Sequence, residues 1–419
     1  MTLLHDHLLL GQKYTILPSM QLAILGRQPA LSCAELEALY GADAITRVSD
    51  EAALVQSDTP LPQDQLGGTM KSALVLAQIQ NTNLADIFSR LETIVPDLAA
   101  QLPEGKVHCG VSVYGEKARK NWLLKQLLTL KKAVKKTGRS IRIIENKSEA
   151  LEAAQVLYNK LTAERGIEII IVKHGAGFII ARTTAVQNFD DYAARDHGRP
   201  KRDAFVGMLP PKLAQIMINL GRRTQDVGLR SEERTENVLL DPFCGTGVIP
   251  QEALLMGYSV VATDLSDKMV DYTDINLQWL KETVGYNGAV LSVDLADATK
   301  QTWLNAERFT SIVCETYLGT PLSGLPSPAK LDEIIDEANE IASGFLKNIA
   351  QQIAPKTRLC VALPAWNLGN EKYKHLKVLD SLEKLGYNRV EFVHANEFEL
   401  IYHRPDQIVA RQLTILEKK

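Results

Sequence analysis

The chain has 419 residues, which at roughly 150 residues per domain corresponds to two or three domains. Hydrophobic residues make up 45% and charged residues 23%, a globular composition that excludes a disordered chain, a collagen-like fibre and a disulfide scaffold. The formal charge of −3 hides an asymmetry, because residues 1–236 carry an excess of four positive charges and residues 237–419 an excess of seven negative ones. The N-terminal half is therefore the part suited to a polyanion.

The five cysteines are far apart and show no CxxC or Cys/His spacing, which predicts a reducing compartment and no metal site. Residues 1–12 lack a basic region before their apolar stretch, and no later segment approaches the roughly 18 uninterrupted apolar residues of a membrane span. We therefore expect a cytoplasmic protein that does not enter a membrane.

Residues 1–65 have the pattern of a small α+β domain. Residues 14–26 are apolar and strand-like, and Ser32 with Glu35 forms a capping-box pattern that predicts a short helix ending at Gly41. Residues 66–186 predict a second α+β domain, with two β-branched runs around a glycine turn that indicate a hairpin. Its expected elements are a strand at 107–114, a helix at 117–137, a strand at 141–145, a helix at 148–163 and the hairpin strands 167–172 and 178–186.

Residues 187–236 are interpreted as a linker that supplies the first helix of the next domain. Residues 187–206 are polar and lack periodicity, as expected of a connection between domains. Pro210 and Pro211 then precede an amphipathic helix that Gly221 ends.

From residue 237 to residue 419 strand and helix patterns alternate, which predicts an α/β domain with a parallel sheet covered by helices on both faces. The tail departs from this alternation, because two strand-like runs flank the turn at Arg404 and Pro405. The last strand is therefore expected to run antiparallel.

The segment 239–247, LLDPFCGTG, combines a buried strand with a glycine turn that leads into a helix. Glycines let a ligand approach the backbone, and a helix N-terminus offers unpaired N–H groups. Asp264 ends the following strand, where a carboxylate can accept both hydroxyls of a ribose. The glycine turn and Asp264 together predict a cofactor that contains adenosine. The alternative is a glycine turn that binds no ligand.

The glycine pattern favours S-adenosylmethionine over a nicotinamide dinucleotide. A dinucleotide requires GxGxxG, but Pro250 replaces the third glycine here. Asp241 precedes the turn, where it would repel a pyrophosphate and attract the methionine ammonium.

These residues resemble the cofactor loop of the THUMP-containing tRNA guanosine-N2 methyltransferases, a family with a Rossmann-like methyltransferase domain. LGRQPALSCAEL is similar to the family's leader domain, RDHGRPKRDAFVGMLPPKLAQIMINL to its linker and first methyltransferase helix, and YHRPDQIVAR to its terminal hairpin. The resemblance implies a leader domain at residues 1–65, a THUMP-like RNA-binding domain at 66–186 and a methyltransferase domain at 237–419. It also implies tRNA as the partner and N2-methylguanosine at position 10, or its dimethyl derivative, as the product.

The resemblance implies a role for individual residues of the cofactor site. Asp264 would hold the ribose hydroxyls, and Asp297 would accept a hydrogen bond from the adenine amino group, although an exposed loop acid is an equal alternative for Asp297. The complete expected cofactor set is Asp241, Phe243, Gly245, Thr246, Gly247, Asp264, Leu265, Asp297 and Ala298.

The catalytic loop of the family is an Asp or Asn, two prolines and an aromatic residue, and this sequence has Glu315, Thr316 and Tyr317 in its place. Glu315 would accept hydrogen bonds from the exocyclic amine, and Tyr317 would stack on a base drawn out of its helix. The missing prolines leave open a site that has lost its activity. Cys314 raises a third alternative, nucleophilic attack on a pyrimidine, but it lies within an apolar strand where a cysteine is usually a small hydrophobic residue.

Residues 117–142 hold many Lys and Arg residues and no acidic one, on a helix whose apolar stripe is Leu123, Leu124, Leu127, Leu128 and Val134. This one-sided charge favours phosphate binding over a merely solvated face. A second basic cluster lies in the linker, although Asp196 and Asp203 weaken it. The expected RNA-binding residues are Lys117, Arg119, Lys120, Lys131, Lys132, Lys135, Arg199 and Arg202.

The sequence thus predicts an S-adenosylmethionine-dependent tRNA methyltransferase. Alternatives are an amino-methyltransferase of another RNA or of DNA, a catalytically inactive tRNA-binding relative and, least favoured, a nicotinamide oxidoreductase. A small activating subunit and the oligomeric state are left open.

Overall fold

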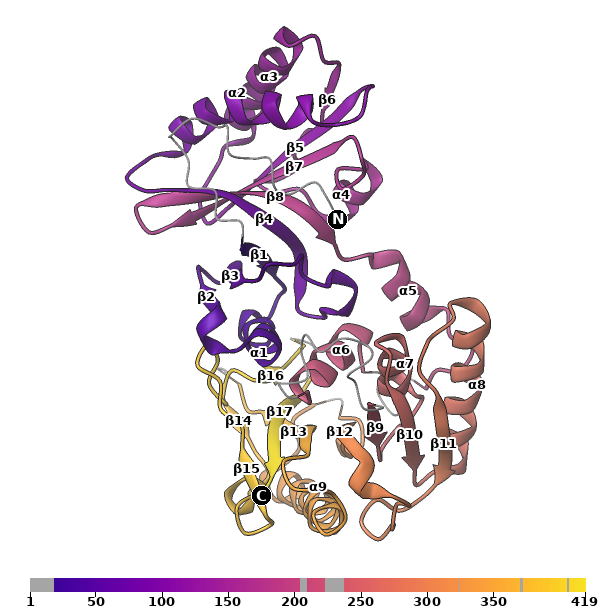
Figure 1. The fold of residues 1–419 in the computed structure, drawn as a ribbon. Helices are drawn as coiled ribbons and strands as arrows, with labels where there is room; N and C mark the ends of the chain where they lie inside the picture. The colour runs from indigo at the N-terminus through magenta and orange to yellow at the C-terminus, as the bar shows by residue number, and fades with distance from the viewer. Residues whose placement is uncertain (1–18, 204–208, 223–236, 323, 370–371, 405–406) are drawn as a thin grey trace. The chain divides into compact units, whose positions relative to one another are not determined.

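The computed structural model describes residues 19–203, 209–222, 237–322, 324–369, 372–404 and 407–419. These residues fall into two compact units (Figure 1). The first comprises the described residues up to Pro29 together with 43–64 and 69–189, and the second comprises 30–42, 65–68 and the described residues from 190 onward.

The first unit is built on one eight-stranded sheet with the order β2-β3-β1-β4-β8-β7-β5-β6. β5 pairs in parallel with β6 and β7, and the other neighbours are antiparallel. The predicted hairpin is present as β7 and β8. The strands are β1 (Met20–Leu25), β2 (Ile45–Arg47), β3 (Ala52–Gln56), β4 (Thr69–Ile79), β5 (Val107–Tyr114), β6 (Ile141–Ile143), β7 (Gly166–His174) and β8 (Gly177–Val186).

Helices α2 (Leu84–Ala100) and α3 (Lys120–Lys136) cover one face of this sheet, and the short helix α4 (Ala153–Tyr158) lies beside β8. The buried stripe of α3 is Leu123, Leu127, Leu130 and Val134, whereas Leu128 is exposed. The predicted stripe was therefore wrong at Leu128, because the helix turns its buried face toward Leu130 instead.

The sheet of the first unit is continuous across residue 65, where the sequence predicted a boundary between two domains. β1 and β4 lie on opposite sides of that boundary in sequence and pair with each other through Leu22 and Ala73. Helix α1 (Pro29–Tyr40) belongs to the second unit, where its Leu31 and Ala34 join the core around α6 (Pro211–Leu220). The strands and the helix of the first 65 residues thus belong to different units.

A fully buried ion pair lies in the sheet of the first unit. Lys71 Nζ is 2.5 Å from Glu168 Oε1, and both side chains are almost inaccessible to solvent. Ser112 Oγ donates to Glu168 Oε1 and Thr183 Oγ1 donates to Glu168 Oε2, both at 2.6 Å. Lys71 also donates to the carbonyl oxygen of Leu151 at 2.7 Å. Both oxygens of this buried carboxylate are therefore satisfied, as burial of a charge requires.

The second unit is built on a nine-stranded sheet whose main path is β11-β10-β9-β12-β13-β17-β15. The first five strands of that path are parallel, and β17 is antiparallel to β13, which confirms both predictions. The strands are β9 (Val238–Asp241), β10 (Ser259–Asp264), β11 (Val290–Leu295), β12 (Phe309–Glu315), β13 (Arg358–Asn367), β14 (Tyr373–Lys374), β15 (Tyr387–Arg389), β16 (Ile401–Tyr402) and β17 (Val409–Lys418).

Helices cover both faces of this sheet. One core joins α1, α6, α7 (Val248–Leu255) and Leu277 of α8 (Asp267–Thr283) to strand residues such as Leu239. The other core packs α9 (Pro328–Ile349) against the neighbouring Leu240. Because successive strand residues point to opposite faces, Leu239 and Leu240 serve the two cores in turn. Short 3-10 helices lie at Ala42–Ala44, Gln63–Gln65, Ala306–Arg308 and Lys377–Ser381.

The segment expected to be an irregular linker contains helix α5 (Phe189–His197). Tyr192 Oη donates to Gln215 Oε1 at 2.5 Å, and Arg195 Nε donates to Glu252 Oε1 at 2.7 Å. The segment is thus held to the second unit by polar contacts. Hydrophobic periodicity does not report such contacts, which is why the sequence did not indicate a helix here.

Candidate active site

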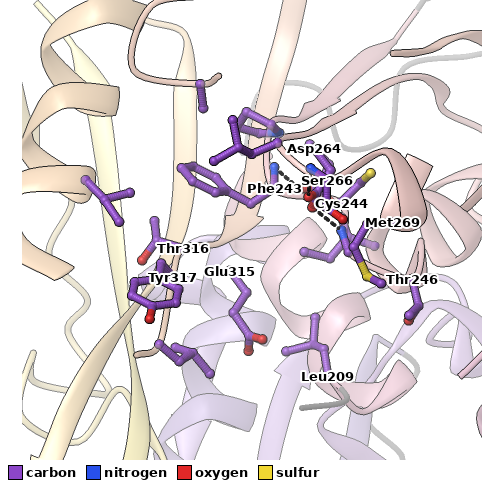
Figure 2. A pocket seen from close by; sticks show the side chains of 18 of the residues that line it. Leu209, Phe243, Cys244, Thr246, Asp264, Ser266, Met269, Glu315, Thr316 and Tyr317 are labelled. Atoms are coloured by element: carbon purple, nitrogen blue, oxygen red, sulfur yellow. Dashed lines mark hydrogen bonds between the residues drawn. The ribbon is translucent and has the colours of Figure 1, made fainter. Parts of the chain in front are cut away.

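A cavity of about 870 Å³ opens at the carboxyl ends of β9, β10 and β12. β9 lies in the middle of the sheet, with β10 on one side and β12 on the other, so the chain reverses its strand order at this place. Ligands of open α/β sheets bind at such a point. Figure 2 shows Glu315, Thr316 and Tyr317 on one side of the cavity and Asp264, Ser266 and Cys244 on the other.

The loop between β9 and α7 takes a conformation that glycine makes possible. Gly245 has φ of +52° and Gly247 has φ of +81°, both in the left-handed region that other residues rarely adopt. A Cβ atom on Gly247 would also lie 3.0 Å from Thr273 Oγ1. Gly247 directly precedes α7, so Gly245, Thr246 and the first N–H groups of the helix border the cavity.

Asp264 ties this loop to β10. Its Oδ2 accepts from Gly245 N at 2.9 Å and its Oδ1 accepts from Ser266 N at 3.0 Å. Burial raises the pKa of Asp264, and the backbone hydrogen bonds oppose that shift. Its carboxylate is oriented by the backbone on both sides, and it lines the cavity.

Asp241 lines the cavity, and only 1% of its surface is exposed. Its Oδ1 accepts a hydrogen bond from Phe243 N at 3.2 Å. Burial raises the pKa of Asp241 well above its usual range, and the nearby carboxylates of Asp264 and Glu315 add to the shift. Asp241, Asp264 and Glu315 are thus among several acidic side chains that line one cavity, which favours a cationic ligand over a phosphate.

The adenine side of the expected site also borders the cavity. Asp297 Oδ1 accepts from Thr299 N at 3.0 Å and from Thr299 Oγ1 at 2.6 Å, and Lys300 Nζ lies 2.8 Å from Oδ2. These contacts lower the pKa of Asp297 to about 2. Leu265 is 74% exposed, whereas Ala298 is buried, and both line the cavity. The exposed Leu265 offers an apolar surface, and the hydrogen-bonded carboxylate of Asp297 lines the same cavity. This combination is compatible with an adenine ring and its amino group.

The loop after β12 brings Glu315 and Tyr317 to the opposite wall. The Glu315 carboxylate forms an ion pair with the buried guanidinium of Arg411 on β17. Thr316 N donates to the carbonyl oxygen of Ala362 on β13 at 3.1 Å, so the β12 ladder continues one residue past the strand. Tyr317 is half-buried, and burial followed by the charge of Glu337 raises its pKa.

Sequence reasoning missed Arg411. The residue lies in the last strand, 96 positions from Glu315, and nothing in its local pattern indicates a contact with the catalytic loop. One signal was present: a charged residue within a largely apolar run of the expected last strand. A buried arginine of this kind needs an anionic partner.

The structure gives no support to a nucleophilic cysteine. Cys314 is fully buried within β12, and burial raises the pKa of its thiol well above the usual range. Cys244 is also buried, and burial is the main cause that raises the pKa of its thiol. A thiolate at either position is therefore disfavoured.

The basic residues of α3 and its approach lie in the first unit and point mainly to solvent. Lys131 is half-buried, and Lys120 lies 3.6 Å from Glu145. The exposed members of the predicted set are Lys117, Arg119, Lys120, Lys132 and Lys135.

The prediction that Arg199 belongs to an exposed RNA-binding cluster was wrong. Only 3% of Arg199 is exposed, and it lies near the buried carboxylate of Glu252. Burial lowers its pKa. Arg202, three residues later, is exposed. The segment packs against α8, where Asn276 Oδ1 accepts from Lys201 N at 2.9 Å, and this packing buries the arginine that the polar sequence suggested was free.

Within the described residues, no helix is both long and apolar enough to cross a membrane.

Residues 199–317 match the model of a family described as "RMKL-like, methyltransferase domain". A tRNA (guanine(10)-N2)-dimethyltransferase of Methanothermobacter thermautotrophicus is 42% identical over 102 residues, which cover 24% of this chain and 27% of that protein. The protein of the same name from Pyrococcus abyssi is 30% identical over 158 residues, covering 38% of this chain and 39% of that protein. A solved structure of TrmN from Thermus thermophilus is 17% identical, covers 96% of this chain and 100% of that one, and has a TM-score of 0.48.

The aligned stretches thus span about a quarter to two-fifths of the curated relatives. The family match itself covers the linker from residue 199 onward, the helix α6 and the strands β9 to β12, together with the loops that line the cavity up to Tyr317. Residues 199–317 are therefore similar to the methyltransferase domain of the RMKL-like family.

Proposed function

We propose that this protein is an S-adenosylmethionine-dependent methyltransferase that forms N2-methylguanosine and N2,N2-dimethylguanosine in tRNA, at guanosine 10. The observation that carries the proposal is the acidic cavity, in which Asp241 and Asp264 lie beside the glycine loop and Glu315 with Tyr317 lies on the opposite wall. The names of the two archaeal relatives support this choice of base and position.

The residues present fit S-adenosylmethionine. The cofactor carries an ammonium and a sulfonium, and Asp241 supplies a carboxylate where a dinucleotide would place its phosphates. Asp264 supplies a second carboxylate, at the position that suits a ribose. Phe243, Leu265 and Met269 supply apolar surface for the adenine ring and the methylene groups. When bound, the sulfonium supplies an electrophilic methyl group.

The chain itself contributes binding and orientation at three points. Asp241 would bind the ammonium. Burial raises the pKa of Asp241, and a bound cation would lower it again because an opposite charge favours the ionised carboxylate. Asp264, held by two backbone N–H groups, would accept the ribose hydroxyls. Asp297 would accept a hydrogen bond from the adenine amino group. Together they fix the methyl group relative to the wall that carries Glu315.

On that wall Glu315 would accept a hydrogen bond from the exocyclic amine of guanine. The amine lone pair is delocalised into the ring, so an acceptor that orients the amine exposes the lone pair to the methyl group. Methylation would exchange the methyl–sulfur bond for a methyl–nitrogen bond and leave a neutral thioether, and Glu315 would accept the proton that the nitrogen loses. Tyr317 would stack on the extruded base.

The first unit would hold the tRNA through the exposed cations of α3, by charge and backbone shape. A tRNA substrate is consistent with the predicted cytoplasmic location.

The test uses the full-length chain, labelled S-adenosylmethionine and two tRNA transcripts that differ only in having guanosine or adenosine at position 10. We expect label in N2-methylguanosine, then in N2,N2-dimethylguanosine, in the first transcript only. Asp264→Ala is the matched control, since it should lose cofactor affinity and label together. Tight binding of tRNA and cofactor without transfer would support the inactive relative instead, and label in the adenosine-10 transcript would refute the position.

A further inference from the structure

We infer that Arg411 is a positioning residue that holds the Glu315 carboxylate against the target amine, and so replaces the rigidity that a proline-containing loop would give. The inference rests on the proposed function. It concerns a residue outside the segment that matches the methyltransferase family, because that match ends at residue 317.

The register of the sheet puts the two side chains on one face. Glu315 is the partner of Ala362 across β12 and β13, and Arg411 is the partner of Pro364 across β13 and β17. Directly opposed residues share a face of the sheet, and residues 362 and 364 are two apart on one strand, so all four side chains point the same way. Ala362 and Pro364 are short, which leaves the space over β13 through which Arg411 reaches Glu315.

The contact is made at the edge of the cavity and not in open solvent. Arg411 is 4% exposed, and its Nε donates to Glu315 Oε1. The Glu315 side chain keeps 15% of its surface and lines the cavity. One carboxylate oxygen is thus held by the guanidinium, and the carboxylate still borders the space that the base would enter.

The contact with Arg411 would offset two disadvantages of a glutamate at position 315, its flexibility and its repulsion by a nearby acid. Glutamate is one methylene longer than aspartate and has an additional rotatable bond, so its carboxylate needs an external restraint. Asp241 also adds negative charge close to Glu315, and a guanidinium offsets this repulsion. The hydrogen bonds of Thr316 N and Oγ1 to the Ala362 carbonyl, at 3.1 Å and 3.3 Å, hold the next residue of the loop to the same strand.

The test measures kcat and the KM values for tRNA and cofactor, together with the melting temperature. We expect Arg411→Met to lower kcat roughly 100-fold, as misplacement of a reacting group by about 1 Å does, with the KM for cofactor unchanged. Arg411→Lys should recover part of the loss, since lysine keeps the charge and lacks the planar fork. The double variant Glu315→Gln/Arg411→Met should be no slower than Glu315→Gln, because the second change then has nothing left to position.

The matched control is Arg358→Met. Arg358 and Glu417 form an ion pair at 3.5 Å between the same two strands, β13 and β17, at the end away from the cavity. This variant should keep wild-type kcat. Wild-type kcat in Arg411→Met, or losses that multiply in the double variant, would overturn the inference while leaving the proposed function intact. Absence of transfer by the wild-type chain would overturn both.

Discussion

Two buried carboxylates in this protein differ in how fully the fold supplies their hydrogen-bond and ion-pair partners. Glu168, in the sheet of the first unit, meets a lysine and two hydroxyl donors, so both of its oxygens are satisfied by the fold itself. Asp241, at the end of β9, receives one backbone hydrogen bond and has two further acids nearby. An ionised group is costly to bury without a partner. We therefore expect Glu168 to serve the structure, whereas Asp241 under the proposed function would bind a cation from outside.

The largest effect is expected where the fold supplies its own partner. Lys71→Met leaves Glu168 buried without a cation, and breaking such a pair costs about 3–5 kcal/mol. Urea denaturation should therefore show a large loss of unfolding free energy. The double variant Lys71→Met/Glu168→Leu should recover much of it, since apolar residues of similar volume often replace a buried pair at little cost. A stable Lys71→Met protein would contradict the contrast drawn between the two acids.

Asp241→Asn should behave in the opposite way. The amide keeps the size of the side chain and can still accept from Phe243 N, but it removes the charge that would bind the ammonium. We expect S-adenosylmethionine affinity to fall roughly 10- to 150-fold, since a hydrogen bond to a charged group is worth about 1.5–3 kcal/mol. The melting temperature should be kept or raised, because burial already disfavours the charged form. Calorimetric titration measures the affinity for the cofactor, and a thermal scan measures the melting temperature. An unchanged affinity would show that Asp241 does not bind the cofactor.

Glu35 of α1 is an intermediate case, satisfied by hydrogen bonds without a cation. It accepts from Gly67 N, Gly68 N and Asn219 Nδ2 at 2.8–2.9 Å, and burial raises its pKa to about 7. Between its ordinary pKa near 4.5 and this value the folded protein holds a proton that the unfolded chain has released. The contribution of Glu35 to the unfolding free energy must therefore fall as pH rises through this window.

The measurement is chemical denaturation from pH 4.5 to 7.5 of the wild type and of Glu35→Gln, which does not titrate. The difference between the two should change on the order of 2 kcal/mol across the window, with wild-type stability falling more steeply. Parallel pH profiles would mean that Glu35 stays ionised on its three donors.

How far the sequence predicted this molecule depended on whether the information was local. The loop at Asp241–Gly247, Asp264 and the antiparallel β17 could be predicted, because a glycine turn, a strand end and a run of β-branched residues each carry their own pattern. The contact of Arg411 with Glu315 could not, since it depends on the register of three strands.

Burial of polar residues was equally hidden. Arg199 and Arg202 look alike in the sequence, yet only Arg202 is exposed, because packing of the segment against α8 decides which of the two meets solvent. The same argument explains α1, whose assignment to the second unit follows from Glu35 and its donors on the 65–68 loop and α6. Contacts between distant parts of the chain leave no trace in composition or periodicity.

The smallest effect is expected from the exposed cations, where the molecule places charge in solvent instead of burying it. Lys132→Ala/Lys135→Ala on α3 should weaken tRNA binding several-fold and reduce the slope of log affinity against log salt by roughly two, one for each lost phosphate contact. Lys281→Ala, an exposed lysine on α8, is the control and should change neither. Filter binding over a range of salt concentrations separates the two readouts. Weaker binding with an unchanged slope would mean that these lysines act through the helix and not on phosphate, because only a lost ionic contact reduces the number of released counterions.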